Sequence, residues 1–132
     1  MGEPSLAEAQ ARIDKLLSFS KTNDIDGLLN MFTDDAIILP NYDKTVRGKD
    51  AIKEWHLKKW AQPLAQRAVY KWEVHHVETN GPIRVVFGPG TLTTPSGQVQ
   101  NIKFVLVARI EGAKGIRMIM INSSDPDPNR PH

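Results

Sequence analysis

The sequence predicts an α+β fold in which three N-terminal helices pack on a curved antiparallel sheet. Before Pro63, apolar residues recur every three or four positions; after it, they alternate with polar residues or form β-branched runs. Short turns join the later segments, which makes neighbouring strands antiparallel. The chain has 132 residues, of which 40% are hydrophobic, so it suits one domain. We expect this domain to span residues 1–124 and a flexible polar tail to follow at 125–132.

The first helix is expected to begin at Ser5, because Ser5 and Glu8 have the spacing of a capping box. Its apolar stripe ends at residues 21–23, which are polar. Asp24 is a typical N-cap residue and predicts a short second helix, whose apolar face extends to Phe32. The chain therefore begins with two helices joined by a tight connection.

Asp34 and Asp35 predict a solvated turn after the second helix. Residues 36–39 are then expected to form a strand, which Pro40 ends. A third helix is predicted to begin at Gly48 and to end before Pro63. With side chains spaced by about 100° around a helix, its inner face carries Ile52, Trp55, His56 and Trp60.

Four strands are expected after Pro63, separated by turns rich in glycine and proline. They span residues 67–79, 83–93, 99–111 and 116–122. The last two are apolar on both strand faces, whereas the helices of a small domain cover only one face of a sheet. We therefore predict a homodimer, formed partly through the outer sheet surface around Val105 and Val107.

Four short segments carry a family resemblance: Asp-Ile-Asp-Gly-Leu-Leu at 24–29, Phe-Thr-Asp-Asp-Ala at 32–36, Pro40, and Gly-Lys-Asp-Ala-Ile at 48–52. Together they resemble the front half of a nuclear transport factor two-like domain, most closely the branch of SnoaL-like polyketide cyclases and ketosteroid isomerases. The resemblance implies a cone-shaped, cystatin-like fold with a mostly apolar pocket at one end. It implies no single activity, because the superfamily includes isomerases, dehydratases, epoxide hydrolases, cyclases and binding domains.

The side chains that ketosteroid isomerase uses are absent at the matching positions. In that family a carboxylate base stands immediately before the proline of the first strand, where this chain has Leu39. The oxyanion-binding tyrosine and carboxylic acid correspond to Leu16 and Leu106. Proton abstraction of the ketosteroid type is therefore not expected.

Two histidines are the candidate catalytic residues. Alternation along residues 70–76 places Tyr70, Trp72 and His76 on one strand face, which we expect to be the helix-covered face. His56 of the third helix is expected to face the same interior. A pair of imidazoles in one cavity can remove and return a proton. The alternative is that either histidine is a hydrogen-bonded core residue.

The candidate substrate-binding residues are two polar side chains and an apolar wall. Tyr42 and Asn122 would hold a substrate oxygen. The wall is predicted to consist of Phe32, Leu39, Trp55, Trp72, Phe104, Leu106, Met118 and Met120. Aromatic and methionine side chains are typical both of small-molecule pockets and of cores, so the same residues could instead fill the space.

Other chemistries find little support. The chain has no cysteine, and Glu73 and His75 supply only half of a metal site, so we expect no metal and no cofactor. Residues 44–71 carry eight basic and two acidic side chains, which leaves open an adaptor for acidic proteins. No base-reading motif accompanies these charges, so nucleic-acid binding is not expected. The absence of a leader-like start and of a long apolar run predicts a cytoplasmic protein without membrane contact.

These observations predict a SnoaL-like enzyme that acts on an apolar cyclic or polyketide-like substrate. The reaction would be an isomerisation, cyclisation or dehydration by cofactor-free acid/base chemistry, with His56 and His76 as acid and base. The alternative is a non-catalytic domain of the same fold that binds a small apolar ligand or serves in dimerisation.

Overall fold

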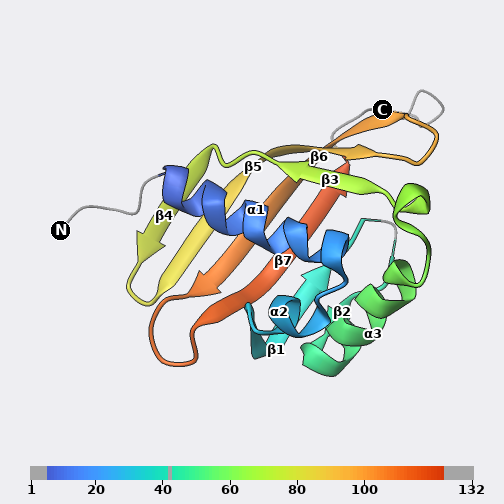
Figure 1. The fold of residues 1–132 in the computed structure, drawn as a ribbon. Helices are drawn as coiled ribbons and strands as arrows, with labels where there is room; N and C mark the ends of the chain where they lie inside the picture. Colours follow the sequence, from blue (N-terminus) through green and yellow to red (C-terminus); the bar gives the residue numbers. More distant parts are fainter. Residues whose placement is uncertain (1–5, 42, 124–132) are drawn as a thin grey trace.

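The computed structural model describes residues 6–41 and 43–123 and confirms the α+β architecture. The helices lie on one face of a curved sheet (Figure 1). The helical elements are α1 (Leu6–Thr22), α2 (Ile25–Leu29), α3 (Gly48–Trp60) and a short 3₁₀ turn, η1 (Leu64–Gln66). The strands are β1 (Phe32–Leu39), β2 (Val46–Arg47), β3 (Val69–Trp72), β4 (His76–Asn80), β5 (Ile83–Thr93), β6 (Val99–Arg109) and β7 (Gly115–Ser123).

The first two helices form for the reasons that the sequence indicates. The buried residues of α1 are Ala9, Ile13 and Leu16, which recur at three- and four-residue steps on one helix face. Asp24 caps α2, because its carboxylate accepts a hydrogen bond of 2.9 Å from the Gly27 amide. The predicted cap at Ser5 and the predicted tail at 125–132 lie outside the described residues.

The sheet has the strand order β2-β1-β7-β6-β5-β3, and β4 pairs with β5 beyond the end of β3. Most pairings are antiparallel, as expected, but β1 and β7 are parallel, so the curved sheet is mixed. Turns between consecutive segments fix the direction of the later strands. They do not fix the direction of β1, which lies beside the last strand of the chain.

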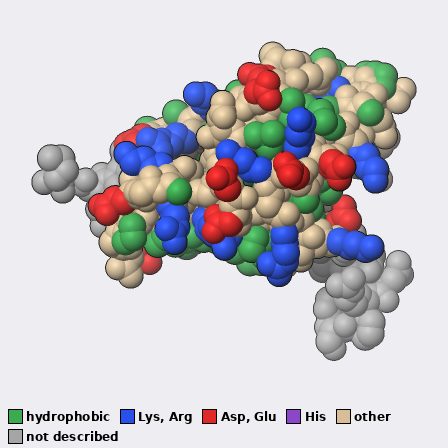
Figure 2. Space-filling model, turned by 90° about the horizontal axis from the view of Figure 1, so that it is seen from below, with side chains coloured by type: hydrophobic (Ala, Val, Ile, Leu, Met, Phe, Trp, Pro, Cys, Tyr) green, Lys and Arg blue, Asp and Glu red, His purple; other side chains and the backbone are tan. Residues whose placement is uncertain are grey.

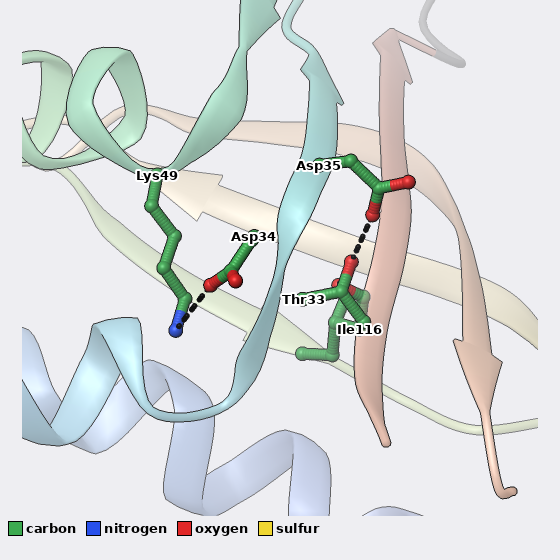
Figure 3. A network of polar contacts seen from close by, with 5 residues as sticks. All are labelled: Thr33, Asp34, Asp35, Lys49 and Ile116. Carbon is green, nitrogen blue, oxygen red and sulfur yellow. Dashed lines mark hydrogen bonds and ion pairs between the residues drawn. The ribbon is translucent and has the colours of Figure 1, made fainter. Parts of the chain in front are cut away.

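The acidic pair near the start of β1 is part of the strand, not a turn as predicted, and Phe32 belongs to β1 instead of α2. Figure 3 shows the contacts that accommodate this pair: Asp34 lies 3.4 Å from Lys49, and Asp35 accepts a hydrogen bond of 2.9 Å from Thr33. The pairing of β1 with β7 shifts its register between Phe32 and Ile37, so the strand is irregular where the aspartates lie.

The single strand predicted for residues 67–79 is broken in two. Between β3 and β4, Glu73 and His75 still donate backbone hydrogen bonds to Pro89 (2.9 Å) and Phe87 (3.0 Å) of β5. The backbones approach so closely that a Cβ on Gly88 would overlap the Glu73 carbonyl oxygen. Only glycine leaves room for this approach.

A side chain of α1 completes the hydrogen bonds at the break. The Gln10 amide donates to the Trp72 carbonyl at 2.7 Å and accepts from the Val74 backbone N–H at 2.7 Å. One side chain therefore replaces a neighbouring strand at this point. It also fixes α1 against the sheet, because both contacts are made to backbone atoms.

The break changes which residues face the helices. Trp72 and Val74 are buried on the inner face, but in β4 the inward position falls on Val77, which pairs with the buried Val86. His76 pairs with the exposed Phe87 and therefore lies on the outer face. The alternation that we extended from Tyr70 to His76 is wrong, because it assumed an unbroken strand.

The inner face of the sheet and the helices share one core. In β6, Ile102, Phe104 and Leu106 are buried, whereas Val105 and Val107 point to the opposite face and are partly exposed. The core on the helical side also contains Ile13, Leu28, Ile38, Ile52, Ile116 and Ile119.

The close approach at Gly88 predicts a large cost for adding a methyl group there. We expect Gly88→Ala to lower the free energy of unfolding by roughly 2–4 kcal/mol, because either the strand pairing or the Glu73 carbonyl must move. The control is Gly81→Asn: a Cβ there meets no atom within 4 Å, and φ is +59°. Asparagine tolerates that conformation, so the control should lose about 1 kcal/mol or less. Urea unfolding of the three proteins measures this, and equal losses would contradict the steric argument.

Candidate functional site

A cavity of about 1080 Å³ lies between the helices and the inner face of the sheet. Its volume is in the range of small-molecule sites, which hold several hundred to about a thousand cubic ångströms. The lining comes from α1, α2, α3, the segment after α3, and the strands β1, β3, β5, β6 and β7. Its aromatic lining residues are Phe32, Trp55, Trp60, Tyr70 and Trp72.

Trp72 forms part of the sheet side of the cavity. Its ring stacks on Phe104, with centroids 4.8 Å apart and an interplanar angle of 13°. The residue is 5% exposed, and its Nε1 atom has no hydrogen-bond partner among the described residues. A buried N–H group in this state is unusual, because most buried polar atoms are paired.

His56 of α3 lines the same cavity from the helical side. It lies between two tryptophans, with ring centroids 4.9 Å from Trp55 and 5.7 Å from Trp60. Its Nδ1 atom is 2.7 Å from the Ile52 carbonyl oxygen. Because a carbonyl can only accept, Nδ1 carries the proton and Nε2 has a free lone pair.

The surroundings of His56 favour its neutral form. Burial lowers the pKa of His56 to about 4; the nearby Lys59 ammonium also lowers it, and the hydrogen bond to Ile52 opposes the change. The imidazole is therefore uncharged at neutral pH. It can accept a hydrogen bond at Nε2, but its low pKa makes it a weak base for a proton bound to carbon.

A small polar cluster borders the cavity at Trp55. The Trp55 indole donates a 3.1 Å hydrogen bond to Asp43, which is the main reason that the pKa of Asp43 is lowered. The Lys59 ammonium lies 3.7 Å from the centre of the Trp55 ring, a cation–π contact. Although Lys59 is exposed as a residue, partial burial lowers the pKa of its ammonium, and Asp43 opposes this. Lys59 therefore supplies a positive charge at the cavity rim.

Arg67 holds the ends of two helices together at another part of the rim. Its guanidinium donates to the carbonyls of Ser20 (2.6 Å), Trp60 (2.6 Å) and Gln62 (2.7 Å), and to the Asn23 side chain (2.8 Å). The carbonyls at helix C-termini carry partial negative charge, which a guanidinium complements. The ends of α1 and α3 are thereby fixed relative to each other.

The predicted site residues divide into three groups. Phe32, Trp55, His56 and Trp72 line the cavity. Phe104 and Leu106 are core residues below it, 1% and 5% exposed. The third group lies on the outer sheet face.

That third group comprises Leu39, His76, Met118, Met120 and Asn122. Register places them there: Leu39 pairs with Met120 and Ile37 with Met118, whereas the neighbouring Ile38 and Ile119 are buried on the inner face. The prediction that Leu39, Met118, Met120 and Asn122 line the pocket is wrong. Both faces of β7 are apolar, so alternation alone did not identify its inner face.

His76 does not reach the cavity. Its ring stacks on Phe87, with centroids 4.6 Å apart, and its Nε2 is 3.4 Å from Glu78. The expectation that His56 and His76 share one cavity is therefore wrong. Tyr42 lies outside the described residues.

Sequence reasoning missed several cavity residues. Tyr70 lines the cavity and burial raises the pKa of its phenol, so it stays protonated. Tyr70 is two residues before Trp72 and therefore on the same strand face, and this spacing could have identified it as a lining residue. Gln10 and Arg67 carry no signal of this kind, because both act through backbone atoms of distant segments.

The described residues contain no group of three or more histidine, aspartate or glutamate side chains arranged to hold a metal ion. Glu73 and His75 do lie 3.4 Å apart, as a pair on the surface. No helix in the described part of the chain is long and apolar enough to cross a membrane.

Three of the basic residues of the segment 44–71 make separate contacts within the protein. Lys49 pairs with Asp34, Lys59 lies over Trp55, and Arg67 binds helix carbonyls. Figure 2 shows basic and acidic side chains interspersed over the face that it presents. The local excess of positive charge in the sequence is thus divided among different contacts.

Comparison with known proteins gives a consistent result. The sequence profile of the SnoaL-like domain matches residues 13–118. A search of curated proteins found no significant match. Among solved structures, the fold is similar to that of a ketosteroid isomerase-like protein from Erwinia carotovora atroseptica, with a TM-score of 0.70, 18% identity, and coverage of 95% of this chain and 100% of that chain.

Two further structures are similar over nearly the whole chain. A putative calcium/calmodulin dependent protein kinase II association domain from Xanthomonas campestris has a TM-score of 0.75 and 12% identity, covering 97% of this chain and 91% of that chain. A nuclear transport factor two-like protein with a cystatin-like fold from Novosphingobium aromaticivorans has a TM-score of 0.70 and 13% identity, covering 96% and 95%. At such identities the likeness shows the fold alone, and it confirms the expected one.

The low pKa of His56 predicts a pH-dependent stability. An unfolded histidine has a pKa of about 6.5, so between that pH and about 4 the unfolded chain binds a proton that the folded chain does not. The free energy of unfolding is therefore highest above pH 6.5. It decreases as the pH falls towards 4 and below, by about 3 kcal/mol at most from this histidine.

Urea unfolding from pH 7 to about pH 4 measures this effect. As the pH is lowered, we expect the free energy of unfolding to decrease less steeply in His56→Asn than in the original chain, because the variant lacks the titrating group. His75→Asn is the control, since His75 has an exposed side chain (57%). Identical pH profiles for the original chain and His56→Asn would contradict a lowered pKa at His56.

Proposed function

We propose that this chain, which belongs to the SnoaL-like domain family, binds a small and mainly apolar organic molecule in the cavity between its helices and its sheet. The observation that carries the proposal is the cavity of about 1080 Å³ with its aromatic lining. A filled core would leave no such space, because protein interiors are close-packed. Two of its polar lining groups, the His56 imidazole and the Tyr70 phenol, are largely buried and uncharged at neutral pH, which suits orientation of a ligand more than charge recognition.

The energy available from such a cavity is sufficient for binding. A ligand that buries about 200 Å² of apolar surface gains roughly 5 kcal/mol, at about 25 cal/mol per Å². Hydrogen bonds to the polar groups add to this, and loss of ligand motion subtracts from it. We therefore expect dissociation constants between the millimolar and micromolar ranges for simple apolar compounds.

A cavity-filling variant tests the proposal. Ile121 lines the cavity, and its neighbour Asn122 points to the outer face of the same strand. We expect Ile121→Trp to weaken binding of the neutral fluorescent probe N-phenyl-1-naphthylamine by about tenfold or more, because the indole occupies the probe's space. Asn122→Trp adds the same side chain outside the cavity and should leave the affinity within about twofold.

Fluorescence titration measures both affinities, and thermal unfolding confirms that both variants fold. Equal effects of the two substitutions would place the bound probe elsewhere. Absence of probe binding to the original chain would contradict the proposal directly.

A narrower proposal is that the chain also transforms its ligand by cofactor-free acid/base chemistry, as an isomerase, cyclase or dehydratase. His56 is the one histidine of the pair that supports it, because Nε2 is unprotonated and has a free lone pair. The pKa of about 4 argues against it, since proton transfer to so weak a base is costly. Product formation that survives His56→Asn would rule out this role.

We also propose that two copies of the chain associate through the outer sheet face. Leu39, Phe87, Val105, Val107, Met118 and Met120 lie on this face, and Phe87 and Met120 are each 41% exposed. Adjacent apolar side chains on an uncovered sheet face are typical of an interface. One structural neighbour is named an association domain, which agrees with this proposal without establishing it.

A charge placed in the middle of this face should prevent association. We expect the original chain to sediment as a dimer at micromolar concentration and Val105→Asp to sediment as a monomer, because an unpaired carboxylate would be buried at the contact. Lys114→Asp changes charge in the exposed loop before β7 and should remain dimeric. A monomeric original chain in analytical ultracentrifugation would contradict the proposal.

A further inference from the structure

A second, smaller cavity adjoins the main one next to α3. Its volume is about 100 Å³. At about 30 Å³ per water molecule in the liquid, this is room for a group of a few non-hydrogen atoms. Four residues line both cavities and form the boundary between them: Trp55, Lys59, Tyr70 and Ile121. A ligand in the main cavity can therefore place a small group at this boundary.

Lys59 is the charged group at this boundary. Its Nζ atom lies 3.7 Å from the centre of the Trp55 ring. Its side chain forms no ion pair and donates no hydrogen bond to any residue that the structure describes. An ammonium has three N–H donors. Because Lys59 is exposed as a residue, a ligand can reach these donors.

Asp43 acts on Lys59 through its charge without pairing with it. Both of its carboxylate oxygens accept other hydrogen bonds, one from the Trp55 indole at 3.1 Å and one from the Lys44 backbone N–H at 2.7 Å. Partial burial is the main reason that the pKa of the Lys59 ammonium is lowered, and Asp43 opposes this change without cancelling it. A partly dehydrated cation thus lies at the boundary, and an anionic acceptor on a ligand would stabilise it.

The charged side chains that line the main cavity also favour an anionic group at its rim. Both acidic lining residues, Asp14 and Glu73, have partners within the protein. The four basic lining residues are Lys21, Lys59, Arg67 and Lys71. The Arg67 guanidinium is bound to helix carbonyls, and Lys59 is the one of the four that also lines the smaller cavity. Lys59 is therefore the cation best placed to meet a charged end of the ligand.

We infer that the ligand carries a carboxylate that pairs with the Lys59 ammonium while its apolar body occupies the main cavity. The inference rests on the proposed binding function and names the class of ligand: an apolar monocarboxylic acid. At the rim a carboxylate keeps part of its hydration, so it avoids most of the desolvation cost that a charge inside the cavity would carry. A cationic group would be repelled by Lys59, and a phosphate would bring more charge than one ammonium balances.

A matched pair of probes tests this inference. The compounds 2-naphthoate and 2-naphthamide share one ring system and are nearly equal in size, but only 2-naphthoate is charged at neutral pH. Displacement of N-phenyl-1-naphthylamine measures both affinities. In Lys59→Met, which keeps a long side chain and removes the charge, we expect 2-naphthoate to bind roughly threefold to tenfold more weakly, the range for a partly exposed ion pair. The affinity for 2-naphthamide should stay within about twofold.

Lys58→Met is the matched control. Lys58 precedes Lys59 in α3 and lines neither cavity, so the same substitution removes the same charge from another side of the helix. It should leave the affinity for 2-naphthoate within about twofold, because salt screens exposed charges that are not in contact. Thermal unfolding confirms that both variants fold. Added salt should weaken binding of 2-naphthoate by the original chain more than by Lys59→Met.

The outcomes separate the inference from the function on which it rests. Unchanged binding of 2-naphthoate by Lys59→Met, or an equal loss for both probes, would overturn the inference and leave apolar binding intact. An equal loss in Lys58→Met would also overturn it, because the effect would then come from net charge. So would failure of 2-naphthoate to displace N-phenyl-1-naphthylamine that the original chain binds. Absence of N-phenyl-1-naphthylamine binding to the original chain would overturn the proposed function and the inference together.

Discussion

The close approach of the Glu73 carbonyl to Gly88 is the constraint on which the site depends. It interrupts the pairing with β5 between β3 and β4, where the chain lies so close to β5 that a Cβ at position 88 would overlap it. Trp72 lies before the interruption and faces the cavity; His76 lies after it and faces outward. Had the strand continued unbroken, the two rings would share a face. The break therefore removes one histidine from the site and leaves Tyr70 and Trp72 as aromatic lining residues from β3.

The helices that close the cavity are attached to the sheet and to each other through backbone atoms. Gln10 binds the backbone at the break, and Arg67 binds carbonyls at the ends of α1 and α3. Both side chains thus satisfy groups that the secondary structure leaves unpaired. The same bonds fix the ends of α1 and α3 relative to each other at the border of the cavity.

The sequence predicts the helices and most of the strands well, because each has a clear period. The capped helix at Asp24 and the inward face of α3, with Trp55 and His56, follow from spacing alone. The strands are different where both faces are apolar. In β7, Met118 and Met120 are as apolar as Ile119 and Ile121, so alternation identifies two faces without showing which one is covered. Register with β1 decides it, and register depends on irregularities at Asp34 and Asp35 that no local pattern indicates.

Burial determines the protonation state of the histidine in the cavity. Burial lowers the pKa of His56, so the imidazole is a neutral acceptor, and the same burial makes the unpaired Trp72 N–H group costly. The helical wall therefore offers an uncharged acceptor at His56 Nε2. The charged groups, Lys59 and Arg67, are held at the rim by Trp55 and by helix carbonyls. A charged group on a ligand would lose its hydration on entering the cavity. None of these protein groups is a buried counter-ion that would compensate for that loss. We therefore expect the interior of such a cavity to favour neutral, mainly apolar groups, and Leu39 stands at the position that corresponds to the carboxylate base of the ketosteroid isomerases.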